Sequence, residues 1–269
     1  HRIVLVEREA RHLFQPSLLW LMTGRRTAAG ISRPLSALTR QGIEVVQGGI
    51  ERIDPAQRNV QVAGKMLTGD YLVVALGAEL AAETVPGLAL AGHDFYTLAG
   101  AESLRAARRA LTRGRVAVLV SGTPFKCPAA PYEAAMLLEA DFRARGLGAA
   151  VRFDIYTPEP GPMATAGPEV SQQLRRMIEG RGIGYHPGHA ITQVDADARR
   201  LVFANGSSAE FDLLAYVPPH RAPAVVQAAG LCGESGWVPV DRATLETKFP
   251  GVYAIGDVTG IPLKIGKPL

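Results

Sequence analysis

The sequence RVAVLVSGTPFKCP at residues 115–128 joins a short aliphatic run to a turn that carries a cysteine. The run at residues 115–120 is typical of a strand buried on both faces of a parallel sheet. A helix is predicted next, at residues 131–145, followed by a second strand at residues 151–156. Because strands and helices alternate here, we predict an α/β fold with a mostly parallel sheet.

The same order of patterns occurs twice along the chain. Each copy has a helix, a strand that begins at a glycine, a meander and a last strand. In the first copy these are residues 31–40, the strand from Gly42, residues 50–72 and the buried strand at residues 71–76. In the second copy they are residues 168–181, the strand from Gly182, residues 191–211 and residues 212–217. Internal duplication of this kind predicts two similar structural units. We therefore predict two interleaved Rossmann-like three-layer domains, each with an antiparallel β-meander. One comprises residues 1–98 and 221–269, and the other residues 99–220.

The ends of the sequence are unusual for a complete domain. Residues 1–7 (HRIVLVE) are already a buried-type strand, with no initiator methionine and no signal peptide before them. We therefore expect a chain truncated at both ends, without its first strand and glycine-rich turn and without its last helices.

Composition excludes several classes of protein. The chain has 269 residues, of which 47% are hydrophobic and 20% charged, as in soluble globular proteins. The formal charge of +4 is scattered along the sequence, so it does not predict nucleic-acid binding. The longest apolar stretch, residues 16–22, is far shorter than the roughly 20 residues of a membrane-spanning helix. Two cysteines are too few for a disulfide framework, and the histidines have no spacing typical of a metal site.

Several strands end in residues suited to holding a ligand. Glu7 closes the first strand, where a carboxylate can accept the ribose hydroxyls of an adenine dinucleotide; alternatively it is a solvated charge at a strand end. Gly77 follows the strand at residues 71–76 and indicates either close approach to a ligand or a simple turn. Gly256 and Asp257 end a third strand, where the carboxylate can bind the hydroxyls of a polyol.

These motifs resemble a known superfamily. Glu7 after HRIVLV, Ala75-Leu76-Gly77 after YLVV and Ile255-Gly256-Asp257 after GVYA are similar to successive FAD-contact motifs of the pyridine nucleotide-disulfide oxidoreductases. Within them, residues 124–133 (PFKCPAAPYE), 236–241 (GWVPVD) and 245–257 resemble the sulfide-oxidising branch, which contains sulfide:quinone reductase and the flavoprotein subunit of flavocytochrome c sulfide dehydrogenase. The resemblance implies an FAD cofactor bound by Glu7, Arg8, Ala75, Gly77, Gly256 and Asp257.

The second domain does not have the pattern of a nicotinamide site. A dinucleotide turn uses three glycines, whereas the turn after residues 115–120 has only Gly122. Prolines in this turn remove N–H donors, and the next strand ends in Tyr156, Thr157 and Pro158 without an immediate acid. We therefore predict that this domain keeps the fold of an NAD domain without its dinucleotide fingerprint.

Cys127 lies in this turn, where the positive end of the following helix and the neighbouring Lys126 can stabilise a thiolate. The resemblance implies that Cys127 forms a persulfide and passes electrons to FAD, and that Glu133 manages protons. Alternatively, Cys127 is a buried small hydrophobe in a tight turn and Glu133 an ordinary first-turn carboxylate. Cys232 is interpreted as a non-catalytic loop thiol, and the second redox cysteine of the branch is expected either to lie beyond Leu269 or to be absent.

The leading hypothesis is an FAD-dependent oxidoreductase that oxidises sulfide, or another small reductant, and passes electrons to a quinone or cytochrome c. By the same resemblance, the protein is bacterial-type and is cytoplasmic or a peripheral membrane protein that attaches through its missing C-terminus. Two alternatives stay open, namely a related NAD(P)H:quinone-type flavoenzyme and a redox-inactive flavin-fold subunit that acts as a binding module.

Overall fold

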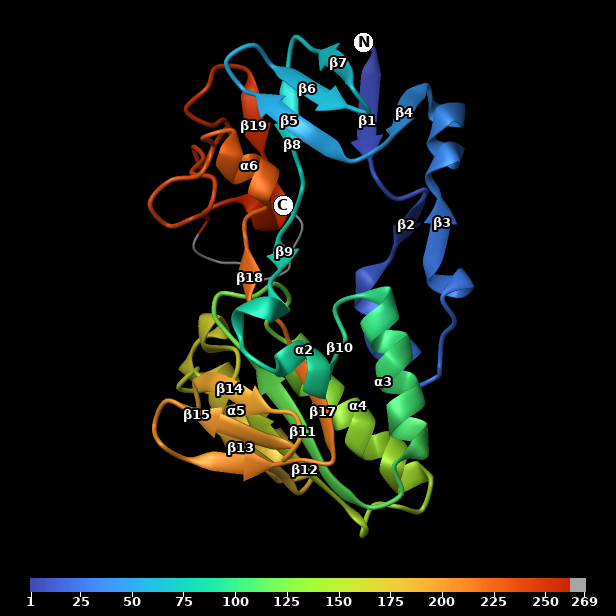
Figure 1. Ribbon diagram of the computed structural model, residues 1–269, viewed down its shortest axis with the longest axis vertical. Helices are drawn as coiled ribbons and strands as arrows, with labels where there is room; N and C mark the ends of the chain where they lie inside the picture. The colour runs from blue at the N-terminus through green and yellow to red at the C-terminus, as the bar shows by residue number, and fades with distance from the viewer. Residues whose placement is uncertain (262–269) are drawn as a thin grey trace. The chain divides into compact units, whose positions relative to one another are not determined.

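A computed structural model of the chain describes residues 1–261 (Figure 1). Its contacts divide the chain into two compact units. Unit 1 comprises His1–Phe14, Ser32–Glu79 and Arg221–Leu269, and unit 2 comprises Gln15–Ile31 and Leu80–His220. The predicted boundaries of the two cofactor-type domains, at residues 98 and 220, stay a prediction. Residues 262–269, which were assigned to the first domain, lie outside the described residues.

Unit 2 is built on a five-stranded parallel sheet. In spatial order its strands are β10 (His93–Asp94), β17 (Leu213–Val217), β11 (Gly114–Val120), β12 (Val151–Tyr156) and β13 (Ile183–His186). The central strand β11 pairs in parallel with β12 and with β17, so that Val118 lies opposite Ile155 on one side and Ala215 on the other. Val116 to Val120 are all buried, which confirms the strand predicted at residues 115–120.

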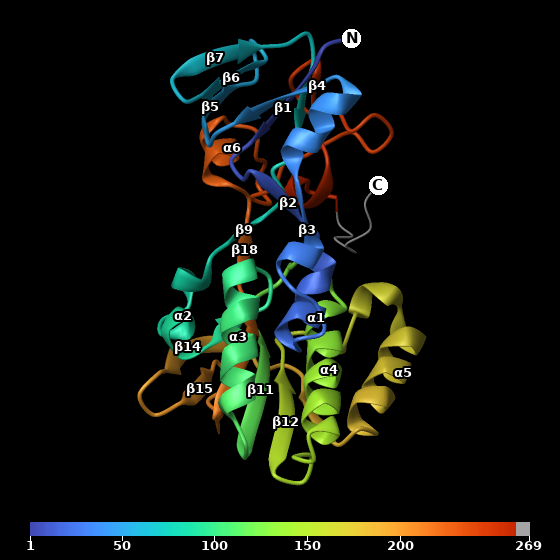
Figure 2. The same ribbon diagram turned by 90° about the vertical axis from the view of Figure 1, so that its right-hand side faces the viewer.

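Helices cover one face of this sheet, and a meander covers the other. The helices are α1 (Leu18–Met22), α3 (Leu98–Ala110), α4 (Ala130–Ala144) and α5 (Pro168–Glu179). Figure 2 shows α1 between α3 and α4, which it contacts. Against the other face lie α2 (Leu88–Ala91) and the antiparallel strands β14 (Ile191–Asp195), β15 (Arg200–Phe203) and β16 (Ser208–Glu210). Leu119 and Leu214 of the sheet join Leu201 of the meander in one buried cluster, so unit 2 has three layers.

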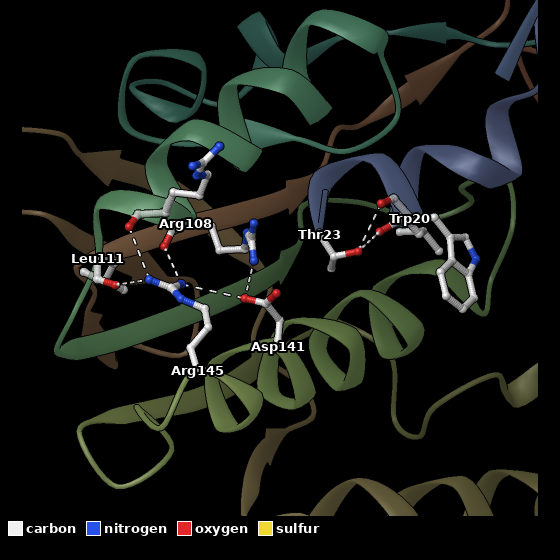
Figure 3. Close-up of polar contacts among 8 residues, drawn as sticks. Trp20, Thr23, Arg108, Leu111, Asp141 and Arg145 are labelled. Atoms are coloured by element: carbon white, nitrogen blue, oxygen red, sulfur yellow. Dashed lines mark hydrogen bonds and ion pairs between the residues drawn. The ribbon is translucent and has the colours of Figure 1, made fainter. Parts of the chain in front are cut away.

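A buried ion pair joins α3 to α4 (Figure 3). Arg108 of α3 pairs with Asp141 of α4, and their side chains are only 6% and 16% exposed. Arg145, just beyond α4, donates to the backbone oxygens of Arg108, Arg109 and Leu111 over 3.1–3.4 Å. These carbonyls belong to the end of α3, where a helix leaves its oxygens without backbone partners. The guanidinium of Arg145 therefore caps the carboxyl end of α3.

Unit 1 consists of several small sheets. Strands β1 (Ile3–Glu7) and β4 (Ile43–Gln47) pair in parallel, as do β8 (Leu72–Val74) and β19 (Val252–Ala254). Strands β5 (Ile50–Asp54), β6 (Asn59–Val62) and β7 (Lys65–Thr68) form the predicted meander, and β2 (Arg11–Leu13) pairs with β3 (Ser32–Pro34). Helix α6 (Ala224–Ala228) contacts β5. The two-residue strands β9 (Glu79–Leu80) and β18 (His220–Arg221) lie where the sequence passes from one unit to the other.

The order of elements confirms the predicted duplication, because the strand, meander and strand β4 to β8 recur as β13 to β17. Two local predictions in unit 1 are wrong. The helix predicted at residues 31–40 is a 3-10 helix at Leu35–Gln41 with no buried residue, which follows Pro34 and ends at the left-handed Gly42. The segment contacts β4 but its leucines are only half-buried, and tertiary burial is what stabilises most short helices.

The strand at residues 71–76 is not fully buried either. Tyr71 is 72% exposed and Val73 is 55% exposed, whereas Val74 belongs to a buried cluster with Val226 and Val252. Successive side chains of a strand point to opposite faces of a sheet. Within residues 1–261, β8 therefore buries one face only.

Candidate functional site

Glu7 lies at the carboxyl end of β1, as predicted. Its backbone oxygen accepts a hydrogen bond from the N–H of Gly48, next to strand β4, at 2.9 Å. One carboxylate oxygen, Oε1, accepts the N–H of Glu9 at 3.0 Å, which holds the half-buried side chain in a turn at the strand end. The neighbouring Arg8 is exposed and pairs with Glu9 at 3.3 Å.

Strands β8 and β19 bring two predicted segments to the same sheet edge. Val74 lies opposite Ala254, and the N–H of Ile255 donates to the oxygen of Val74 at 3.0 Å. The strands are parallel, so the segments that follow them in the sequence lie next to each other. These segments, Ala75 to Gly77 and Gly256 to Asp257, are the ones predicted to contact the cofactor. Both carboxyl ends therefore meet at one place.

The backbone at this edge turns through glycines in the left-handed conformation. Gly77 has φ +66° and Gly256 has φ +74°, in the left-handed region that glycine adopts at little cost. A Cβ placed on either glycine would meet no atom within 4 Å, so the space above both is open. Leu76 is 36% exposed and Ile255 38% exposed, which gives this edge an apolar surface next to the half-buried Asp257. Open space, apolar surface and a carboxylate fit an aromatic cofactor with a polyol chain.

Cys127 lies in unit 2, in the turn between β11 and α4. Its thiol is exposed, which argues against the alternative of a buried small hydrophobe. The residue has φ +55°, an uncommon conformation for a residue with a side chain. Its backbone oxygen accepts the N–H of Ala130, the first residue of α4, at 2.9 Å. Cys127 is therefore placed just before the amino end of the helix, as predicted.

Lys126 is held by two residues outside the predicted site, Gln15 and Tyr96. Its ammonium donates to Oε1 of Gln15 at 3.1 Å and lies 5.9 Å from the centre of the Tyr96 ring. The Tyr96 hydroxyl in turn donates to the backbone oxygen of Lys126 at 2.8 Å. Gln15 and Tyr96 are distant from Cys127 in the sequence and carry no motif of their own, so no local pattern could have indicated these contacts.

Glu133 lies in the first turn of α4 and is half-buried, and this burial raises the pKa of its carboxyl. A second acid of this region, Glu159, follows β12 and was not predicted. Its Oε2 accepts hydrogen bonds from the hydroxyls of Tyr132 at 2.7 Å and Thr157 at 3.3 Å. Burial raises the pKa of Glu159, and the two hydrogen bonds lower it in part. The acid missing directly after the strand is thus present three residues later, where Tyr132 binds it.

Cys232 has a different environment from Cys127. It belongs to unit 1 and is half-buried beside the cluster of Val226 and Val252. Burial raises the pKa of its thiol, which disfavours the thiolate. The contrast agrees with the interpretation of Cys232 as a loop thiol without a redox role.

The described residues, 1–261, contain no helix long and apolar enough to cross a bilayer. Over the same range, histidine, cysteine and acidic side chains do not gather in groups of three or more that could hold a metal ion.

Comparison with known proteins identifies the family of the chain. The sequence profile of the pyridine nucleotide-disulphide oxidoreductases matches residues 1–267. Over 97% of the chain, the sequence is 26% identical to the mitochondrial sulfide:quinone oxidoreductase of Mus musculus, of which it covers 60%. It is also 28% identical, over 76% of the chain and 49% of the relative, to the nitric oxide reductase FlRd-NAD(+) reductase of Aeromonas salmonicida.

The structure is similar to the crystal structure of the sulfide:quinone oxidoreductase of Aquifex aeolicus, with a TM-score of 0.87 at 23% identity over 97% of this chain and 63% of that one. The fold is therefore that of a mixed α/β oxidoreductase with parallel sheets. The chain belongs to the pyridine nucleotide-disulphide oxidoreductase family. Members of this family typically bind FAD. The chain spans about three fifths of the length of the sulfide:quinone oxidoreductases that it matches.

Proposed function

We propose that the full-length protein is an FAD-dependent oxidoreductase that oxidises sulfide at Cys127 and passes the electrons to a quinone or cytochrome c. The observation that carries the proposal is the position of Cys127, exposed in the turn before α4. In a dinucleotide-binding unit this turn would hold the pyrophosphate. Relatives named sulfide:quinone oxidoreductase, similar over 97% of the chain, support the choice of substrate.

The residues proposed to hold FAD all lie in unit 1. Glu7 would accept the ribose hydroxyls of the adenosine half, with Arg8 beside it. The segments that include Ala75, Gly77 and Gly256 would let the backbone approach the cofactor closely, and Asp257 would bind the ribityl chain. Supporting this assignment are the left-handed glycines and the open apolar edge of β8 and β19.

In the proposed reaction, the Cys127 thiolate and a hydrosulfide ion form a Cys127 persulfide, with the loss of one proton and two electrons. A sulfur–sulfur bond forms, and the S–H bond of hydrosulfide breaks. Bound FAD would supply the acceptor for the electron pair, which a quinone or cytochrome c then removes. Glu133 would take the proton, since its raised pKa brings its carboxyl closer to working pH. The amino end of α4 favours the anionic sulfur.

A second candidate is an enzyme that takes electrons from NAD(P)H, and the similarity to the FlRd-NAD(+) reductase of Aeromonas salmonicida supports it. The single glycine of the turn, Gly122, and the engagement of Glu159 by Tyr132 count against a dinucleotide in unit 2. Oxidation of NADH by the complete protein would favour this candidate. A flavin spectrum that sulfide does not bleach would instead favour the redox-inactive binding subunit.

The decisive experiment compares the two cysteines in the full-length protein. Stopped-flow spectroscopy would follow flavin reduction by sulfide in the wild type, in Cys127→Ser and in Cys232→Ser. We expect the rate to fall by orders of magnitude in Cys127→Ser, because the nucleophile is lost. Cys232→Ser should react at close to the wild-type rate. If Cys127→Ser reacts as fast as the wild type, sulfide oxidation at Cys127 is excluded.

A further inference from the structure

The turn between β11 and α4, residues 121–129, is here called the cysteine loop. Two of its backbone oxygens lie near the buried hydroxyl of Tyr96. Oη of Tyr96 lies 2.8 Å from the oxygen of Lys126 and 3.5 Å from the oxygen of Cys127. A tyrosine hydroxyl has one proton to donate, so the shorter contact is the hydrogen bond and the longer one a weak second contact. Since Tyr96 is only 7% exposed, water has little access to replace it.

Tyr96 is itself held in place by the start of α3. Its N–H donates to Oδ1 of Asp94 at 2.9 Å, and the same oxygen accepts the N–H of Thr97 at 2.7 Å. The Thr97 hydroxyl oxygen then accepts the N–H of Gly100, which caps α3. The Tyr96 ring also meets the ring of His220 edge-on, at 5.4 Å between centres. The hydroxyl is thus presented to the loop by a rigid part of unit 2.

The cysteine loop needs such support from outside. Cys127 has φ +55°, and a residue with a side chain stays in this left-handed conformation only where its surroundings hold it. Pro124 and Pro128 lie within the loop and have no N–H groups, so fewer backbone donors are available to fix it. The carbonyl groups are therefore the natural points of attachment, and Tyr96 binds the carbonyl of Lys126, which is joined directly to the nitrogen of Cys127.

We propose that Tyr96 is a positioning residue for Cys127. Its hydroxyl holds the carbonyl of Lys126, and through it the left-handed backbone of Cys127, so that the thiol is presented in one orientation. Tyr96 acts through the backbone and does not need to touch sulfide. The effect on catalysis rests on the proposed function of Cys127, whereas the effect on the loop does not.

The test removes only the hydroxyl, with Tyr96→Phe in the full-length protein. The matched control is Tyr132→Phe, which removes the hydroxyl of another buried tyrosine, whose hydrogen bond ends on Glu159 instead of on the loop. Hydrogen exchange measured by mass spectrometry should become about threefold to tenfold faster at residues 121–129 in Tyr96→Phe, the factor expected for loss of one neutral hydrogen bond. Exchange in this segment should stay at the wild-type rate in Tyr132→Phe. Equal exchange in all three proteins would overturn the proposal.

The catalytic arm measures flavin reduction at several sulfide concentrations. In Tyr96→Phe we expect the limiting rate to fall about threefold to tenfold with an unchanged half-saturating sulfide concentration, because fewer molecules present the thiol correctly. A wild-type limiting rate despite faster exchange would overturn the positioning role. A Cys127→Ser enzyme that still reacts with sulfide would contradict the proposed function instead, and the exchange result would stand by itself.

Discussion

Glu159 carries a carboxyl group whose surroundings oppose ionisation. Burial raises its pKa above the ordinary value of 4.5, although hydrogen bonds from Tyr132 and Thr157 lower it in part. For an acid with a raised pKa, the stabilising contribution is fully present below the unfolded pKa and is lost as the pH rises through the folded pKa. The ionised group therefore destabilises the protein at neutral pH.

The replacement Glu159→Gln removes this charge and keeps an oxygen that can accept the Tyr132 hydroxyl. We expect the variant to be more stable than the wild type at pH 8, by less than about 1 kcal/mol because the group is partly solvated, and to lose this advantage at pH 4. Urea denaturation at both pH values would measure it. Glu234→Gln, at an exposed loop position, is the control and should show no such pH dependence. A Glu159→Gln variant less stable at pH 8 would contradict the argument.

Glu7 provides a test of the proposed FAD site. We expect Glu7→Ala to weaken FAD binding by about 1.5–3 kcal/mol, the range for loss of a hydrogen bond to a charged group. Titration of the deflavinated full-length protein would measure the affinity. The control is Glu44→Ala in the neighbouring strand β4, whose carboxylate pairs with Arg2 at 2.7 Å on the exposed surface. Equal affinity in Glu7→Ala and the wild type would remove Glu7 from the site.

At the level of whole elements, the ion pair between α3 and α4 provides a test of what stabilises their packing. Loss of Asp141 would leave the cation of Arg108 buried without its partner. We expect Asp141→Ala to lower the free energy of unfolding by about 3–5 kcal/mol, and the double replacement Arg108→Met with Asp141→Leu to recover most of this loss. Urea denaturation would measure both. A double variant no more stable than Asp141→Ala would show that the ion pair contributes more than charge neutralisation.

The elements of unit 2 could be predicted well because their patterns are strong. Strand β12 lies at the predicted residues 151–156, and α4 begins within one residue of its predicted start. The pattern of apolar residues did not predict the structure where the type of element depends on how deeply its side chains are buried. The segment at Leu35–Gln41 has helical spacing and contacts β4 but buries no residue, and Val73 is aliphatic yet exposed. Whether an apolar residue is covered depends on distant segments, which local periodicity does not contain.

Over the whole molecule, the sequence predicted the family and the repeated order of elements, and it located Cys127, Gly77 and Gly256 at the ends of elements. It did not predict what surrounds them. The contacts of Tyr96 with the cysteine loop and of Tyr132 with Glu159 join residues about 30 positions apart. Such contacts arise from the way the sheet order brings helix starts and strand ends together, so only the folded structure reveals them.

Helix α1 also has a consequence for synthesis of the chain. Its residues Leu18, Leu21 and Met22 are at most 1% exposed once they lie against α3 and α4, yet α4 is complete only at Ala144. At 5–20 residues per second, a ribosome adds the intervening stretch of about 120 residues in roughly 6–24 s. Helix α3 ends at Ala110, so during this interval the segment LLWLM has at most part of its native cover. We therefore expect the nascent chain to expose an apolar segment that chaperones can bind.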